Sequence, residues 1–224
     1  PMMISMLVQA LYNIVDSVFV SRLSENAFNA VGLAFPLQSL MIAVAVGTAV
    51  GINAFLSKTL GEKDFEKADI IAQNGIFLAI ASYVAFAVIG LLVSRPFFAS
   101  QTEVLEVREY GVTYLTICCV AGMGIFLQTT FERLLLATGK TFYTMITQGT
   151  GAVINIILDP ILIFGYFGMP RMGIAGAAVA TVIGQIIAAI LALVFNLKCN
   201  RELNISMKGF RPNGHLIVQI YKVG

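Results

Sequence analysis

A single charged side chain, that of Asp159, lies in residues 141–170, which read TFYTMITQGTGAVINIILDPILIFGYFGMP. Further stretches contain no Lys, Arg, Asp or Glu at all, namely residues 26–57, 70–94, 110–131 and 172–197. About 20 apolar residues suffice to cross the hydrocarbon core of a bilayer as a helix. Runs of this length and composition predict an all-α polytopic membrane protein.

The overall composition agrees with this class. Of the 224 residues, 58% are hydrophobic and 12% are charged, whereas a soluble domain has roughly twice that charged fraction. The net charge of +2 is too small to indicate a nucleic-acid partner. The HExxH, GxSxG and CxxC motifs are absent, and no metal-ligand spacing stands out. We therefore expect no enzyme, no cofactor and no metal beyond a Na⁺ ion at a cation site.

Helix breakers divide the chain into six predicted spans and the start of a seventh. Gly61-Glu62-Lys63-Asp64 predicts a polar turn, Ser94-Arg95-Pro96 the end of a helix, and Gly139-Lys140 a short break. The predicted spans are residues 1–21, 28–57, 67–94, 107–135, 141–165 and 173–197, with the seventh beginning near 214. The first run begins at Pro1 without a preceding Met, and the chain ends in HLIVQIYKVG. We therefore expect it to be part of a longer protein.

Basic residues predict the orientation, because cytoplasmic loops carry an excess of Lys and Arg. The odd-numbered connectors hold four: Arg22, Arg95, Arg108 and Arg171. The even-numbered connectors hold nine: Lys58, Lys63, Lys67, Arg133, Lys140, Lys198, Arg201, Lys208 and Arg211. This bias places the amino terminus and residues 198–213 in the cytoplasm. We expect Arg133 and Lys140, with Glu132 nearby, to lie at a membrane edge as anchors or topology signals.

Two acids lie in otherwise uncharged apolar segments, Asp16 in LVQALYNIVDSVFV and Asp159 in AVINIILDPILIFG. A charged side chain at the bilayer centre costs about 2.5–3.5 kcal/mol on insertion scales, so such a residue normally faces a cavity or a partner. Gln9 and Tyr12 share a helix face with Asp16, since they precede it by seven and four residues. Asn155 shares a face with Asp159 for the same reason.

The fifth predicted span offers oxygen ligands. Pro160 has no N–H to donate to the carbonyl of Ile156, which leaves an oxygen free beside Asp159. A carboxylate, an amide oxygen and a free carbonyl could bind a hard monovalent cation or form a proton-binding network. If Asp16 and Asp159 meet, their mutual repulsion in a low dielectric would let one bind and release a proton near neutral pH. The alternative is a static hydrogen-bonded pair that only holds two helices together.

The order and spacing of several segments are typical of one protein family. Pro1 precedes Asp16 by fifteen residues, and the other segments are VDSVFVSRLSENAFNAVGLAFP (15–36), LGEKDFEKA (60–68), RLLLATGKT (133–141), NIILDPILIFG (155–165) and GIAGAAVAT (173–181). Together they resemble the amino-terminal half of a multidrug and toxic compound extrusion (MATE) transporter, over essentially the whole chain. The N-x-x-x-D-P segment with the downstream GAAxAT is the most specific part of the resemblance.

The resemblance implies a twelve-helix fold in two six-helix lobes. Residues 1–197 would form the first lobe, truncated at its start, residues 198–213 a cytoplasmic inter-lobe linker, and residues 214–224 the start of the second lobe. The partners implied are the lipid bilayer, the second lobe and small organic substrates. The expected location is the plasma membrane.

The resemblance also implies roles for individual residues. The family's first-lobe cation site matches Asp16, Asn155, Asp159 and Thr181, and its cavity lining matches Gln9 and Tyr12. Pro1 matches a proline linked to bending of the first helix, and we expect Pro160 to bend the fifth.

The leading hypothesis is thus an antiporter that exports organic, often cationic, drugs or toxic compounds in exchange for H⁺ or Na⁺. One rival is a lipid or oligosaccharide flippase of the same superfamily. Such a protein would be expected to carry several basic residues in its cavity for a phosphate headgroup. No Lys or Arg lies deep in any predicted span. Another rival is a non-transporting membrane subunit whose buried acids are structural.

Overall fold

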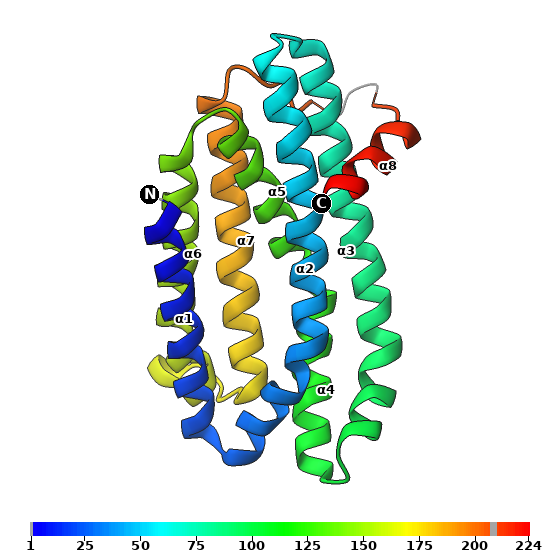
Figure 1. The fold of residues 1–224 in the computed structure, drawn as a ribbon. Coiled ribbons are helices and arrows are strands. Elements are labelled where there is room, and N and C mark those ends of the chain that lie inside the picture. Colours follow the sequence, from blue (N-terminus) through cyan, green and yellow to red (C-terminus); the bar gives the residue numbers. More distant parts are fainter. Residues whose placement is uncertain (1, 207–209) are drawn as a thin grey trace.

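Long helices lie side by side in an elongated bundle (Figure 1). The computed structural model describes residues 2–206 and 210–224, without the side chains of residues 2–6, 9, 10, 12 and 13. The helices are α1 (Met2–Leu23), α2 (Glu25–Gly61), α3 (Phe65–Gln101), α4 (Leu105–Val120), α5 (Met123–Ala137), α6 (Thr141–Phe164), the short 3₁₀ helix η1 (Tyr166–Gly168), α7 (Ile174–Cys199) and α8 (Gly214–Val223). The described residues contain no β-strand, which confirms the predicted all-α class.

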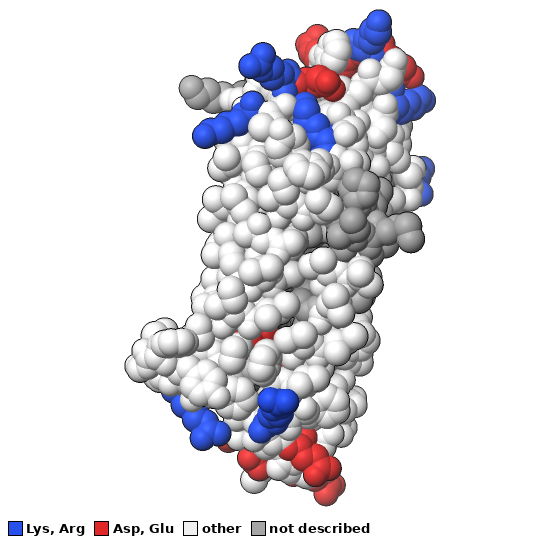
Figure 2. Space-filling view, turned by 90° about the vertical axis from the view of Figure 1, so that its left-hand side faces the viewer, with Lys and Arg blue, Asp and Glu red and all other residues white. Residues whose placement is uncertain are grey.

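The helices have the length and composition of membrane spans. Among the described residues, α2, α3, α6 and α7 are each long and apolar enough to cross a bilayer, and the bent pair α4–α5 makes a fifth candidate span. In Figure 2 the charged side chains gather at the two ends of the molecule, with a broad and almost uncharged belt between them. This distribution fits a bundle whose middle lies in hydrocarbon.

The predicted single span over residues 107–135 is wrong in one respect, because the chain breaks at Ala121 and Gly122. The helices α4 and α5 meet there at 44°. A break in a helix frees backbone carbonyls, which must find other partners inside a membrane. Tyr83 of α3 supplies one, since its hydroxyl donates to the carbonyl oxygen of Val120 at 2.8 Å. The bend is therefore held by a residue far away in the sequence.

The predicted helix end at residues 94–96 is also wrong, because α3 continues through Pro96 to Gln101. Proline removes one backbone donor from a helix. Transmembrane helices tolerate this loss where Ser or Thr side chains and neighbouring helices satisfy the backbone groups. The carbonyl that Pro96 leaves without its usual donor is that of Leu92, and the Ser94 hydroxyl donates instead to the carbonyl of Gly90.

The predicted polar turn at residues 61–64 is confirmed. Helix α2 ends at Gly61 and α3 begins at Phe65, after Asp64 accepts a hydrogen bond from the backbone N–H of Lys67 at 3.1 Å. A side-chain acceptor of this kind satisfies one of the donors that every helix start leaves open. Ser24 caps α2 in the same way, through the N–H of Ala27 at 3.0 Å.

The segment between α7 and α8 packs against the lobe. Leu203 and Ile205 are buried in an apolar cluster with residues of α2, α3, α5, α7 and α8. Three hydrogen bonds hold the segment and the start of α8 to α3: Asn204 N–H to Asp69 Oδ1 (2.7 Å), Gln73 Nε2 to the Ser206 carbonyl (2.8 Å), and Asn213 N–H to Asn74 Oδ1 (3.0 Å). The predicted linker is thus docked on α3 over its described residues.

Helix α8 makes an unusually close contact with α2. A Cβ atom added at Gly51 would clash with the carbonyl oxygen and side chain of Ile220, which is fully buried. Small residues allow helix backbones to approach in this way. The absence of a side chain at Gly51 therefore allows α8 to pack closely against α2.

We expect Gly51→Ala to destabilise the protein by about 1–3 kcal/mol, because the added methyl group meets backbone that cannot move aside alone. Gly32→Ala is the matched control, since it lies on the same helix and a Cβ there meets nothing within 4 Å. The control should be neutral or slightly stabilising. Thermal unfolding of the purified full-length protein in detergent measures both. Equal stability of the two variants would contradict the close contact.

Candidate functional site

Three of the predicted site residues form one buried polar cluster between α6 and α7. Asn155 and Asp159 lie one turn apart on α6 and are 2% and 0% exposed, and Thr181 lies on α7 and is 9% exposed. The Asn155 amide is satisfied when its nitrogen donates to Asp159 Oδ2 at 3.2 Å and its oxygen accepts from the Thr181 hydroxyl at 3.2 Å. The amide thereby links the carboxylate to the neighbouring helix.

Glycines bring these two helices together. A Cβ atom at Gly184 of α7 would lie 2.8 Å from the carbonyl oxygen of Gly151 on α6, and 3.5 Å from the Cβ of Asn155. Gly184 and Thr181 are three residues apart, and Gly151 and Asn155 are four apart, so each pair shares a helix face. The contact between glycines is therefore what places the Thr181 hydroxyl on the Asn155 amide.

Asp16 approaches the cluster from α1, which packs along α6. The rings of Phe19 and Phe164 meet edge to face across this interface, with centroids 6.5 Å apart. Asp16 and Asp159 thus lie on helices that pack against each other. The Oδ1 atom of Asp16 is buried and has no hydrogen-bond partner. An unsatisfied buried oxygen of this kind is costly unless something binds to it.

The cluster has the chemistry of a site for a small cation. Among the described residues, neither Asp16 nor Asp159 forms an ion pair with a basic side chain. Asp159 accepts its hydrogen bond from the neutral Asn155 amide, and Asp16 has a buried oxygen without a donor. Carboxylate, amide and hydroxyl oxygens are ligands that suit hard cations, and a carboxylate can equally take a proton. The structure brings the residues together; their role in ion binding stays a prediction.

The remaining predicted residues have mixed outcomes. Pro160 lies inside α6 directly after Asp159, and the helix runs on through it to Phe164. Pro1 lies outside the described residues, as do the side chains of Gln9 and Tyr12. The lining of the cavity by Gln9 and Tyr12 and the bending of the first helix at Pro1 stay predictions.

Sequence reasoning did not identify Glu132 as a buried residue. The structure shows it 5% exposed on α5, with its carboxylate facing polar side chains of α5 and α6. Two amides donate to it, Gln128 Nε2 to Oε1 (3.0 Å) and Gln148 Nε2 to Oε2 (2.8 Å). The Thr147 hydroxyl lies 2.9 Å from Oε1 and 2.9 Å from the Thr144 carbonyl oxygen, and its single proton can go to only one of them. We call Glu132, Gln128, Thr147 and Gln148 the Glu132 network.

The network offsets the cost of burying a charge. The effective penalty for a buried carboxylate is several kcal/mol, and a hydrogen bond to a charged group contributes about 1.5–3 kcal/mol. The amide donors, and the Thr147 hydroxyl when its proton points to Oε1, offset part of that penalty. The sequence does carry a signal, because Gln128 and Glu132 are four residues apart and Thr147 and Gln148 follow in the next helix. The adjacent Arg133 concealed that signal.

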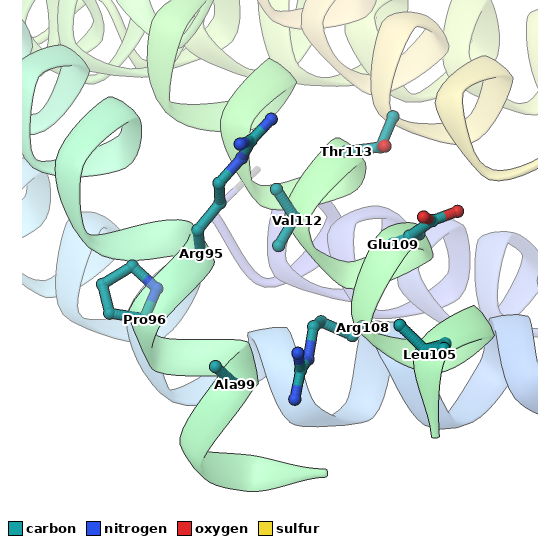
Figure 3. Close-up of a pocket in the computed structure, with 8 residues that line it drawn as sticks. All are labelled: Arg95, Pro96, Ala99, Leu105, Arg108, Glu109, Val112 and Thr113. Carbon is teal, nitrogen blue, oxygen red and sulfur yellow. The ribbon is translucent and has the colours of Figure 1, made fainter. Parts of the chain in front are cut away.

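A cavity lies away from both polar clusters, at the ends of two other helices. Its volume is about 650 Å³, it opens between the end of α3 and the start of α4, and it contains none of the predicted site residues. Figure 3 shows that two of its lining side chains, Arg95 and Arg108, point in different directions. Arg108 reaches the carbonyl oxygen of Thr102 at 3.3 Å. The two guanidinium groups thus do not converge on one ligand position.

A family model and curated proteins match the sequence of this chain. The MatE family model matches residues 1–161. The multidrug export protein MepA of Staphylococcus aureus (strain MSSA476) is 28% identical over 229 aligned residues, which cover 100% of this chain and 49% of MepA. The chain therefore spans about half the length of the curated relatives it matches.

Solved structures give the same result. A multidrug resistance MATE family transporter of the MOP superfamily, in an outward-facing conformation, superposes with a TM-score of 0.89 at 29% identity, over 98% of this chain and 48% of that one. A MOP superfamily transporter from Pyrococcus furiosus superposes with a TM-score of 0.90 at 29% identity, over 100% of this chain and 49% of that one. Its binding pocket is described as having reverse polarity, which suggests a different function for that protein.

We expect Thr181→Val to lower the free energy of unfolding by about 0.5–1.5 kcal/mol, because the buried Asn155 amide oxygen loses its hydroxyl donor and keeps only the backbone N–H of residue 181, at 3.2 Å. Thr48→Val is the matched control. The Thr48 hydroxyl is buried on α2 and has no hydrogen-bond partner, so its removal should be neutral or stabilising. Thermal unfolding of the full-length protein in detergent distinguishes the two. A Thr181→Val variant as stable as Thr48→Val would show that the Asn155 link contributes nothing.

Proposed function

The chain belongs to the MatE family, and on that premise we propose that it forms one six-helix lobe of an antiporter that exports organic, cationic compounds in exchange for H⁺ or Na⁺. The name of the relative MepA, a multidrug export protein, supports drug-like substrates. The proposed location is the plasma membrane, with the amino terminus and residues 198–213 in the cytoplasm. Its function is transport and no enzymatic activity is proposed.

The observation that carries the proposal is that Asp16 and the Asp159 cluster lie on two helices, α1 and α6, that pack together inside an apolar bundle. Two carboxylates without basic partners repel each other in a low dielectric, and a bound cation or proton relieves that repulsion. We assign the coupling-ion site to Asp16, Asp159, Asn155 and Thr181. Gln9 and Tyr12 are proposed to shape the adjacent substrate pocket.

Binding at this site can drive transport only if the ion has different affinities for two conformations. In the proposed cycle, a bound cation lets α1 approach α6 closely. A first helix bent towards α6 leaves a smaller cavity, and the drug is released outside. Loss of the cation restores repulsion between the acids and reopens the cavity to the next substrate.

The distribution of basic side chains supports a drug exporter over a lipid or oligosaccharide flippase. A phosphate headgroup would need guanidinium or ammonium groups in the cavity. On the face that Figure 2 shows, the Lys and Arg side chains lie towards the two ends of the molecule. A purely structural role for the acids is the other alternative. Retention of gradient-driven transport by variants with both acids neutralised would favour it.

We expect Asp16→Asn and Asp159→Asn each to reduce gradient-driven efflux of a fluorescent cationic dye to background, because an amide cannot take up a proton and binds cations poorly. The assay uses everted vesicles that contain the full-length protein, with either a proton or a sodium gradient imposed. The gradient that drives the wild type identifies the coupling ion.

Glu62→Gln serves as the control, since this exposed acid lies in the turn between α2 and α3 and should leave efflux unchanged. Size-exclusion profiles in detergent establish that the amide variants are folded. Full efflux by both amide variants would refute the site assignment. Absence of dye movement by the wild type under either gradient would refute the drug-export proposal and favour lipid-linked substrates.

A further inference from the structure

We propose that the Glu132 network is a second binding site for the coupling cation, in the half of the lobe that the predicted topology places towards the cytoplasm. The inference rests on the proposed antiport function, because it adds a second station for the same ion. It is carried by the buried carboxylate of Glu132 and by the three neutral side chains that surround it.

The two carboxylate sites occupy opposite ends of one helix. Thr147 lies near the start of α6 and Asp159 near its end. Thr147 and Asp159 are twelve residues apart, which corresponds to about 18 Å along a helix at 1.5 Å per residue. Gln148 and Asp159 are eleven residues apart, which places them on almost the same face of α6. The two sites therefore lie along the same side of α6, one near each end.

The Glu132 network has the composition of a cation site. The three side chains around the carboxylate present amides or a hydroxyl, and each of these groups also carries an oxygen that can act as a ligand. A half-turn of the Gln128 or Gln148 amide would present its oxygen where its nitrogen now lies. One carboxylate with three neutral oxygens gives a single negative charge, which matches a monovalent cation.

Among the described residues, no basic side chain forms an ion pair with the Glu132 carboxylate. The next basic residue along the chain after Arg133, Lys140, reaches the side-chain oxygen of Asn200 at 3.4 Å. A carboxylate has about four acceptor positions. The two amides occupy two of them here, and the Thr147 hydroxyl lies beside a third. The fourth, on Oε2, is open to a proton or a metal cation.

Between the two sites the helices are in direct contact. Gly151 lies between Gln148 and Asn155 on α6, and its carbonyl oxygen abuts Gly184 of α7. This packing leaves no space for an ion between α6 and α7 at that level. The Glu132 network can therefore bind its cation independently of the Asp159 cluster, and exchange between the two requires the contact between the glycines to open or the ion to travel along another face.

The test measures cation binding to the full-length protein in detergent, through the dependence of its unfolding temperature on NaCl, with choline chloride as the salt control. A second series varies pH in choline chloride, which separates Na⁺ from H⁺. The background is the double variant Asp16→Asn/Asp159→Asn, in which the first site has lost both charges. We expect a cation-dependent rise in unfolding temperature to persist in this background and to be lost when Glu132→Gln is added.

Glutamine at position 132 keeps an oxygen acceptor and a planar shape, so the network can stay hydrogen-bonded while its charge is lost. Glu202→Gln is the matched control, because Glu202 is an exposed acid of the segment after α7, and it should leave the cation response intact. Thr147→Val keeps the charge and removes one ligand. It should raise the half-maximal cation concentration about tenfold.

Two outcomes would overturn the proposal: absence of any cation response in the double variant, or a response that Glu132→Gln and Thr147→Val both leave unchanged. Either would make the network a static clamp between α5 and α6. The dye-efflux assay reports separately on the antiport function. A cation response that depends on Glu132 in a protein that moves no dye would support the second site and refute the drug-export proposal.

Discussion

The backbones of α6 and α7 touch where Gly184 faces the carbonyl oxygen of Gly151, and the candidate site depends on this contact. Lipid tails are as apolar as the side chains of the helices, so helices associate in a membrane through close packing and hydrogen bonds between them. Here the two effects coincide. The glycines let the helices approach, and the approach brings the Thr181 hydroxyl within 3.2 Å of the Asn155 amide. A larger residue at either glycine would separate the helices and break that link.

The acids inside the lobe differ in how well their oxygens are satisfied. Glu132 accepts hydrogen bonds from two amides and has the Thr147 hydroxyl beside it. Asp159 accepts one hydrogen bond from Asn155, and Asp16 has a buried oxygen that accepts none. Unsatisfied buried groups are expensive, so a ligand that satisfies them gains the most where the deficit is largest. Asp16 is therefore the residue at which a bound cation or proton changes the energy of the lobe most. Its helix, α1, is the element best placed to move in response.

Sequence reasoning succeeds where local physics decides the outcome. The absence of charge over long stretches predicts the spans, and the spacing of Asn155 and Asp159 predicts their shared face. It fails where a distant residue decides. The break after Val120 is held by Tyr83, which lies 37 residues away in the chain. The burial of Glu132 was not predicted for a similar reason, because its polar neighbours Thr147 and Gln148 come from another helix. Its charged neighbour in the sequence, Arg133, suggests a membrane edge.

Docking of the segment after α7 constrains how this lobe can move. Leu203 and Ile205 are buried in the apolar cluster near the turn between α2 and α3, and Asn204 is bonded to Asp69. Gly51 of α2 receives Ile220 of α8 at close range. Moving this segment or α8 against the lobe would expose apolar side chains and leave backbone groups without partners, which is costly in a bilayer and at its surface. The described parts of the segment and α8 therefore travel with the lobe as one body.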